Sequence, residues 1–85
     1  MNLGDYMKIC VLEHGWVMVG QLEKDGDEYL LINANVVRRW GTKEGLGELA
    51  SKGPLPDTKL EKTPLVRFHK NKLIFTISCD ESKWK

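Results

Sequence analysis

The sequence predicts an all-β domain: a small SH3-like or OB-like barrel, or a rolled antiparallel sheet, with one short helix near residues 44–52. We expect about six or seven strands, because short β-rich runs recur at a spacing of roughly ten residues. Gly, Asp, Asn and Pro clusters separate these runs. Helical spacing of apolar residues occurs once, and no internal repeat interrupts the pattern.

The first two strands are predicted at 6–13 and 16–23, joined by a short loop at His14-Gly15. The second run is apolar on both of its faces, because successive side chains of a strand alternate between faces and apolar residues occupy both sets. Such a strand needs two covers. One is the core, and the other is a second sheet or a neighbouring subunit.

The strongest turn signal is Asp25-Gly26, since glycine supplies the positive φ of a two-residue type I′ hairpin. It leads into a predicted third strand at 27–33. A fourth follows at 36–40, with a bulge or bend near Asn35.

From Gly41 onward the β pattern stops, and Leu46, Leu49 and Ala50 form the one helical spacing. Gly53 and the proline after it end that helix. A weak strand at 58–62 precedes a predicted closing hairpin of 65–69 with 72–79, which turns at Lys70-Asn71. That hairpin places Phe68 opposite Leu73, and Val66 opposite Phe75.

The 85 residues form a single small domain, 1–85. A chain of this length buries only about 60–65% of its unfolded surface, which favours self-association as a source of further stability. The polar tail, 80–85, is expected to fray, although Trp84 is an unusual side chain to leave in water. Because so short a chain gains stability from self-association, we expect a homo-oligomer.

A net charge of +1 excludes a global field that would attract polyanions. The N-terminus has no signal-peptide pattern, and no stretch approaches the ~18 apolar residues of a membrane span, which predicts a cytoplasmic protein. Cys10 and Cys79 lie in apolar runs and are expected to be buried thiols. A disulfide between them would require the first and last strands to pair.

Catalysis is not expected. The histidines His14 and His69 lie in a loop and beside a turn, outside any local catalytic motif, and no serine has a nucleophile-elbow context. The Cys and His residues lack metal-ligand spacing, so we expect no metal and no cofactor. Gly45-Leu46-Gly47 has neither the lysine of a phosphate loop nor an alternating βα context.

Arg38, Arg39 and Trp40 form the principal candidate site, extended by the loop residues Thr42, Lys43 and Gly45. Adjacent strand residues face opposite sides, so at most one of the two arginines can face the interior. An arginine beside an indole offers a fork for phosphate or carboxylate and a stacking surface. In the alternative interpretation these residues have only a structural role: Trp40 closes the barrel and the arginines pair with nearby carboxylates.

A second basic patch combines Arg67, His69, Lys70 and Lys72. It would form a nucleic-acid surface if it lay on the same side as Arg38 and Arg39, and would be a solvated hairpin face otherwise.

The segment VVRRWGTKEGLGELASKGP, with DTKL and VRFHK further on, resembles a family of short bacteriophage and prophage proteins of unknown function. RRWGT and GLGELA are its most specific parts. The resemblance implies a phage origin and action in the host cytoplasm, and it carries no active site.

We therefore expect a small phage-encoded protein that acts by binding. Its target is a nucleotide signal or another anionic ligand, or a host or defence protein that it inhibits. Two alternatives stay open: a small-barrel nucleic-acid-binding module and a structural virion or assembly protein.

Overall fold

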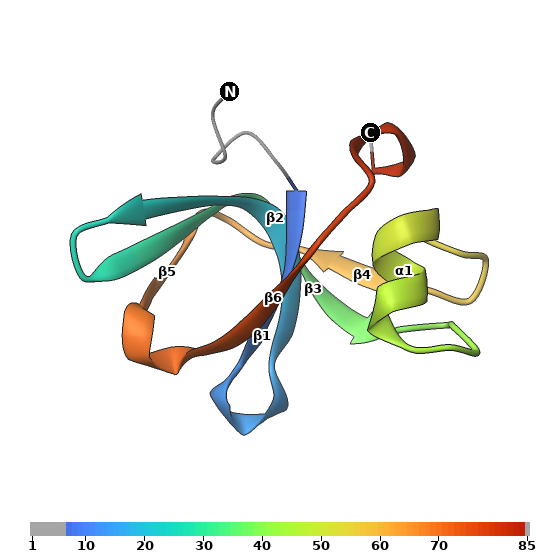
Figure 1. Ribbon diagram of the computed structural model, residues 1–85, viewed down its shortest axis with the longest axis horizontal. Coiled ribbons are helices and arrows are strands. Elements are labelled where there is room, and N and C mark those ends of the chain that lie inside the picture. Colours follow the sequence, from blue (N-terminus) through green and yellow to red (C-terminus); the bar gives the residue numbers. More distant parts are fainter. Residues whose placement is uncertain (1–6, 85) are drawn as a thin grey trace.

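The computed structural model describes residues 7–84, and Figure 1 shows its antiparallel sheet with α1 at one side. The strands are β1 (Met7–Leu12), β2 (Val17–Asp25), β3 (Glu28–Arg39), β4 (Lys59–Lys62), β5 (Val66–His69) and β6 (Leu73–Ser78). The helix is α1 (Leu46–Lys52), and the 3-10 turns are η2 (Glu13–Gly15), η3 (Lys70–Lys72) and η4 (Glu81–Lys83).

The sheet has the strand order β4-β3-β2-β1-β6, and β5 pairs with the first part of β3. Strands contain 53% of the described residues, and the α-helix and 3-10 turns together contain 21%. The predicted all-β class is confirmed. The sheet is rolled but does not close into a barrel. Of the two predicted forms, the rolled antiparallel sheet is therefore the observed one.

The two predicted tight turns join β1 to β2 and β2 to β3. In the first, His14 and Gly15 have φ values of 66° and 81° within η2. In the second, Gly26 has a φ of 62°. Asp27 does not share the positive φ, so the predicted type I′ geometry, which needs positive φ at both central residues, is wrong.

The predicted third and fourth strands are one continuous strand, β3, which bends at a bulge. Between the pairs Val19–Asn35 and Gln21–Ile32 the register shifts. Asn33 lies in this bulge with a φ of 53°, slightly before the predicted bend at Asn35. A bulge sharpens the local twist, and this one lets β3 pair with β5 before the bend and β4 after it.

The predicted closing hairpin is wrong. β5 pairs with β3, where Phe68 lies opposite Tyr29, and β6 pairs with β1, where Phe75 lies opposite Val11. η3 carries the chain from one edge of the sheet to the other instead of folding it back. Each strand thereby gains a partner that is distant in sequence, and local alternation carries no information about that choice.

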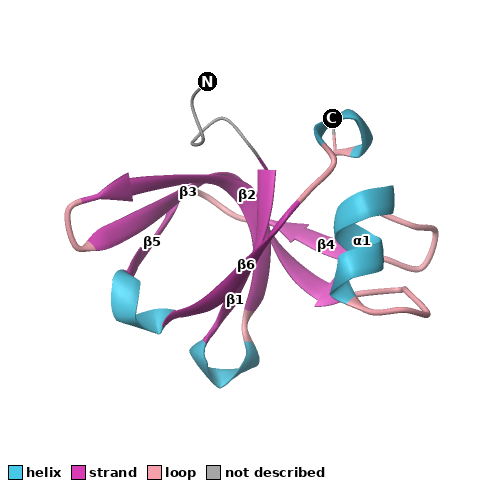
Figure 2. Cartoon of the chain, viewed as in Figure 1, coloured by secondary structure: helices cyan, strands magenta, loops and turns pink. Residues whose placement is uncertain are grey.

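The two faces of β2 are covered by different structures, as its two-sided apolar pattern requires. One face packs with Ile9 and Val19 against α1, which contributes Leu49. On the other face the roll of the sheet encloses Met18 with residues such as Leu31. Figure 2 shows α1 beside the sheet and β5 on the opposite side of the molecule. A helix and the sheet's own curvature, not a second sheet, supply the two covers.

The tail that was expected to fray is packed against α1. Asp80 N–H and the indole N–H of Trp84 both donate to the carbonyl of Ala50, each at 3.0 Å. Trp84 also packs against the apolar cluster under α1. The last described residues therefore cover part of the core.

Candidate functional site

Arg38 lies at the end of β3, at a bulge in its pairing with β4. Its guanidinium carbon is 5.9 Å from the ring centroid of Trp16, a cation–π distance. Its Nε and Nη2 atoms both donate to Oε1 of Glu61, at 3.2 and 2.7 Å. The guanidinium therefore rests on an indole and is held by a single carboxylate oxygen.

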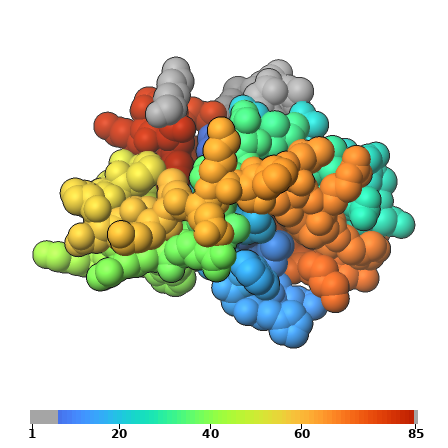
Figure 3. Space-filling view, turned by 180° about the vertical axis from the view of Figure 1, so that it is seen from behind, coloured from blue at the N-terminus to red at the C-terminus, as the bar shows by residue number. Residues whose placement is uncertain are grey.

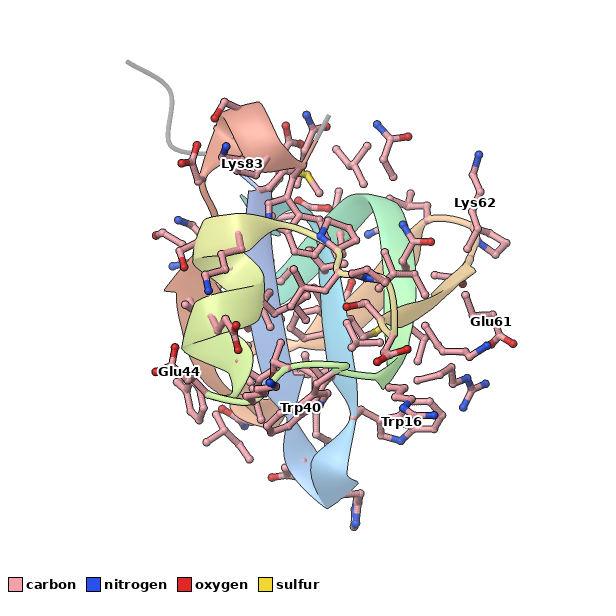
Figure 4. All side chains as sticks on the ribbon, turned by 90° about the vertical axis from the view of Figure 1, so that its right-hand side faces the viewer. Trp16, Trp40, Glu44, Glu61, Lys62 and Lys83 are labelled. Carbon is pink, nitrogen blue, oxygen red and sulfur yellow. The ribbon has the colours of Figure 1, made fainter. Side chains whose placement is uncertain are left out.

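Arg39 and Trp40 continue this surface. Arg39 is exposed and lies directly across from Lys59 of β4. Trp40 is 42% exposed and Trp16 is 49% exposed. Figure 4 shows the two indoles at the same end of the molecule, below α1. We call Trp16, Arg38, Arg39 and Trp40 the tryptophan–arginine surface.

Three of these four residues, Arg38, Arg39 and Trp40, were predicted from the sequence. Neither arginine faces the interior, which the predicted limit of one allows. Trp16 was missed as a site residue because it precedes a strand that is remote in sequence. Only the pairing of β2 with β3 brings it beside Arg38.

The loop residues of the predicted site form an internal cap for α1. Thr42 Oγ1 accepts a hydrogen bond from Gly45 N–H at 3.1 Å, and Oε1 of Glu48 accepts from the N–H groups of Lys43 and Glu44, at 2.9 Å each. These bonds explain why α1 begins at Leu46, later than the predicted residue 44.

The hydrogen bond from Glu44 N–H, followed by that from Lys52, lowers the pKa of Glu48. The start of the helix is thus occupied by the protein's own carboxylate. Thr42, Lys43 and Gly45 serve this cap and lie next to the tryptophan–arginine surface in the chain.

The second predicted patch is interleaved with acidic side chains. Arg67 lies 3.4 Å from Asp25 and 3.6 Å from Glu28, and Lys70 lies 3.3 Å from Asp27. Lys72 pairs with Glu13 at 3.3 Å, and His69 Nδ1 accepts from Asn71 N–H at 3.1 Å. These contacts reduce the positive potential of the patch.

The two predicted basic groups lie apart. Arg67 is opposite Leu30 near the start of β3, whereas Arg38 is near its end. At 3.3 Å per residue the separation along the strand is about 25 Å. Figure 3 agrees, with residues around 42 (green) at the left and residues around 70 (deep orange) at the right. They do not form one continuous nucleic-acid surface.

A cavity of about 500 Å³ lies near the tail, away from the tryptophan–arginine surface. Figure 4 shows Lys83, one of its lining residues, at the end opposite Trp16 and Trp40. It is lined by Met7, Gln21, Asn33, Asn35, Pro54, Leu60, Glu81, Lys83 and Trp84. This cavity was not predicted from the sequence. Two polar residues could have indicated it: Gln21 on β2 and Asn35 on β3 each interrupt an apolar stretch of their strand.

The cysteines are free and buried. Cys10 belongs to the cluster inside the roll and Cys79 to the cluster under α1. Burial is the main cause that raises the pKa of Cys10 to about 12 and that of Cys79 to about 11. Both thiols therefore remain protonated at neutral pH.

Within residues 7–84, no three His, Cys, Asp or Glu side chains gather as a metal site would require. No helix in this part of the chain has the length and apolar character needed to cross a bilayer. Comparisons with protein families, with curated proteins and with solved structures find no match for this chain. The fold and its surfaces therefore carry the functional argument.

Proposed function

We propose that this protein acts by binding a partner protein through the tryptophan–arginine surface. The observation that carries the proposal is the grouping of two half-exposed indoles with two exposed arginines at one end of the molecule. Tryptophan and arginine are among the residue types enriched in the side chains that dominate interface energies. Exposed to this extent, the indoles lose favourable burial that a partner would restore.

The partner segment that fits this surface is acidic. The pair of Arg38 with Glu61 is exposed, and such pairs contribute about 0.2–1 kcal/mol, so a partner carboxylate can replace Glu61 at small cost. Arg39 and Lys59 lie directly opposite each other, and like charges in that position repel. A carboxylate placed between them would relieve the repulsion.

A protein partner suits the geometry better than a free nucleotide. The four side chains of the surface are exposed. The backbone N–H groups of Lys43 and Glu44, which could have held a phosphate, already bind Glu48. The resemblance of RRWGT and GLGELA to short phage proteins supports a phage-encoded inhibitor of a host or defence protein, acting in the host cytoplasm. Catalysis has no part in this proposal.

The test follows the three indole N–H signals in a nitrogen–proton NMR spectrum during titration with a Glu-rich peptide that contains tyrosine. The signals of Trp16 and Trp40 should shift. The signal of Trp84 should stay, because its N–H is bonded to Ala50 at the other end of the molecule. Parallel titrations use mononucleotides and a single-stranded oligonucleotide.

Arg38→Ala and Arg39→Ala, made separately, should each weaken peptide binding about tenfold, or about 1.4 kcal/mol. Arg67→Ala is the matched control, since Arg67 is also an exposed, ion-paired arginine of an edge region, and it should have no effect. Equal losses in all three variants, or shifts produced by a nucleotide and not by the peptide, would contradict the proposal.

A further inference from the structure

The free edge of β6 differs from the other edges of the sheet. β6 ends the strand order and pairs only with β1 among the described strands. Its sequence, LIFTIS, contains no charged residue, no proline and no glycine. Strands of this composition with an unpaired edge are templates for pairing with another strand.

The opposite edge carries the protection that β6 lacks. β4 reads KLEK, with a charged residue at three of its four positions. β5 follows Pro64 and contains Arg67. Charged side chains and proline are the usual means by which proteins prevent edge-to-edge pairing. In β6 the single irregularity is a bulge at the start of its pairing with β1, which leaves the rest of the strand regular.

The side chains of β6 are also unusually exposed for an apolar strand. Ile74 is 59% exposed and Phe75 is 49% exposed, and the residues after them, Thr76 and Ser78, are exposed as well. The backbone is available too. Cys79 N–H donates to Met7 on β1, so by the alternation of an antiparallel strand Thr76 and Ser78 direct their N–H and C=O groups away from β1.

We propose that two copies of this chain form a symmetric dimer in which their β6 strands pair antiparallel about Thr76. A two-fold axis makes such an interface self-complementary. The paired segment runs from Ile74 to Ser78, because Asp80 N–H already donates to the carbonyl of Ala50 on α1. Lys72 and Asp80 are equally far from Thr76 in sequence, so beyond the paired segment this register brings the side chain of Lys72 in one copy towards that of Asp80 in the other. The two sheets then become one continuous sheet.

Charge complementarity supports a second copy as the occupant of this edge. Lys70 and Lys72 precede β6, and Asp80 and Glu81 follow it. Antiparallel pairing brings the basic end of one strand to the acidic end of the other, whereas parallel pairing would align like charges. Lys72 and Asp80 are both exposed. Lys72 makes an exposed ion pair with Glu13, and Oδ1 of Asp80 accepts hydrogen bonds from Ser82. No residue of the tryptophan–arginine surface belongs to β6: Arg38, Arg39 and Trp40 lie at or directly after the end of β3, and Trp16 directly precedes β2. The proposed dimer therefore does not use that surface.

Analytical ultracentrifugation over a range of protein concentrations tests the dimer, with Thr76→Lys and Thr76→Val compared with the parent. The lysine variant places two like charges at the centre of the interface and should raise the dissociation constant more than about 100-fold. The valine variant keeps the edge uncharged and β-favouring and should remain dimeric. A parent that stays monomeric up to millimolar concentration, or a lysine variant that dimerises as the parent does, overturns the proposal.

Hydrogen exchange on the parent protein gives a measurement that does not depend on how the variants fold. The amides of Thr76 and Ser78 should become more protected as the protein concentration rises, and the amides of β4 should not change. A dimer whose concentration-dependent protection falls outside β6 overturns the proposed interface. Protection confined to β6 together with loss of the dimer in Thr76→Lys supports it.

Discussion

At the scale of single residues, Gly41 occupies a position that has no room for a side chain. Its φ is 68°, and a Cβ built there would lie 2.4 Å from the backbone of Asp57 and Thr58. The close approach comes from the return of the chain after α1, where Thr58 Oγ1 donates to the carbonyl of Trp40 at 2.7 Å. Gly26 shares the positive φ, at 62°, but has open space around it.

Gly41→Ala should therefore destabilise the fold by at least about 2 kcal/mol, because the methyl group meets backbone that cannot move aside cheaply. Gly26→Ala is the matched control and should cost about 1 kcal/mol, from the positive φ alone. Urea unfolding at neutral pH measures both. Equal losses would show that the chain around residues 57–58 relaxes without cost.

At the scale of elements, α1 depends on its surroundings. Its seven residues are too few for a stable isolated helix, and Leu46, Leu49 and Ala50 bury its inner face. The N-cap residue, Gly45, has no side chain that could cap the helix. Glu48, inside the helix, instead accepts hydrogen bonds from the N–H groups of Lys43 and Glu44. The Glu48 side chain is only 11% exposed and also pairs with Lys52 at 3.2 Å.

Glu48→Gln should lower the midpoint of thermal unfolding by a few degrees at pH 7. The pKa of Glu48 is lowered in the folded protein from its ordinary 4.5. The ionised carboxylate therefore stabilises the fold above that pH, and this contribution is lost as the pH falls through the lowered folded value. The difference between parent and variant should therefore shrink as the pH is lowered from 7 to 2.

Glu44→Gln is the control for this prediction. Glu44 is exposed, and its carboxylate has no hydrogen bond or ion pair with the rest of residues 7–84. Its unfolding should match that of the parent at both pH values. A Glu48→Gln variant as stable as the parent at pH 7 would contradict a stabilising cap.

At the scale of the whole molecule, the sheet separates two apolar clusters, and the chain's last segment helps to cover one of them. Trp84 packs against the cluster under α1 and donates to Ala50. Cys79 N–H ties the same segment to β1 through Met7. The tail thus links the helix to the sheet.

Trp84→Ala should cost about 2–4 kcal/mol, since it removes a partly buried indole and leaves a cavity beside the helix. Trp40→Ala, which removes an indole that is 42% exposed, should cost less than about 1 kcal/mol. Chemical denaturation measures the pair. If Trp84→Ala lowers the free energy of unfolding as little as Trp40→Ala, the tail does not contribute to the core.

The candidate site was predictable in part, for reasons that differ from residue to residue. Arg38, Arg39 and Trp40 are consecutive, so their grouping could be read directly from the sequence. Trp16 and Glu61 reach Arg38 only through the pairing of β3 with β2 and β4. The role of Glu48 was partly foreseeable, because a carboxylate early in a helix competes for its N–H groups.

The sequence by itself determined the class of the fold, most strand positions, the two early turns and the single helix. These depend on alternation, glycine conformations and short apolar spacing, which are local. Tertiary structure alone decided that β5 joins β3 while β6 joins β1, that the tail packs under α1, and which residues surround Arg38. Those choices depend on contacts between residues that are distant in sequence, whose free energy no short segment of the chain encodes.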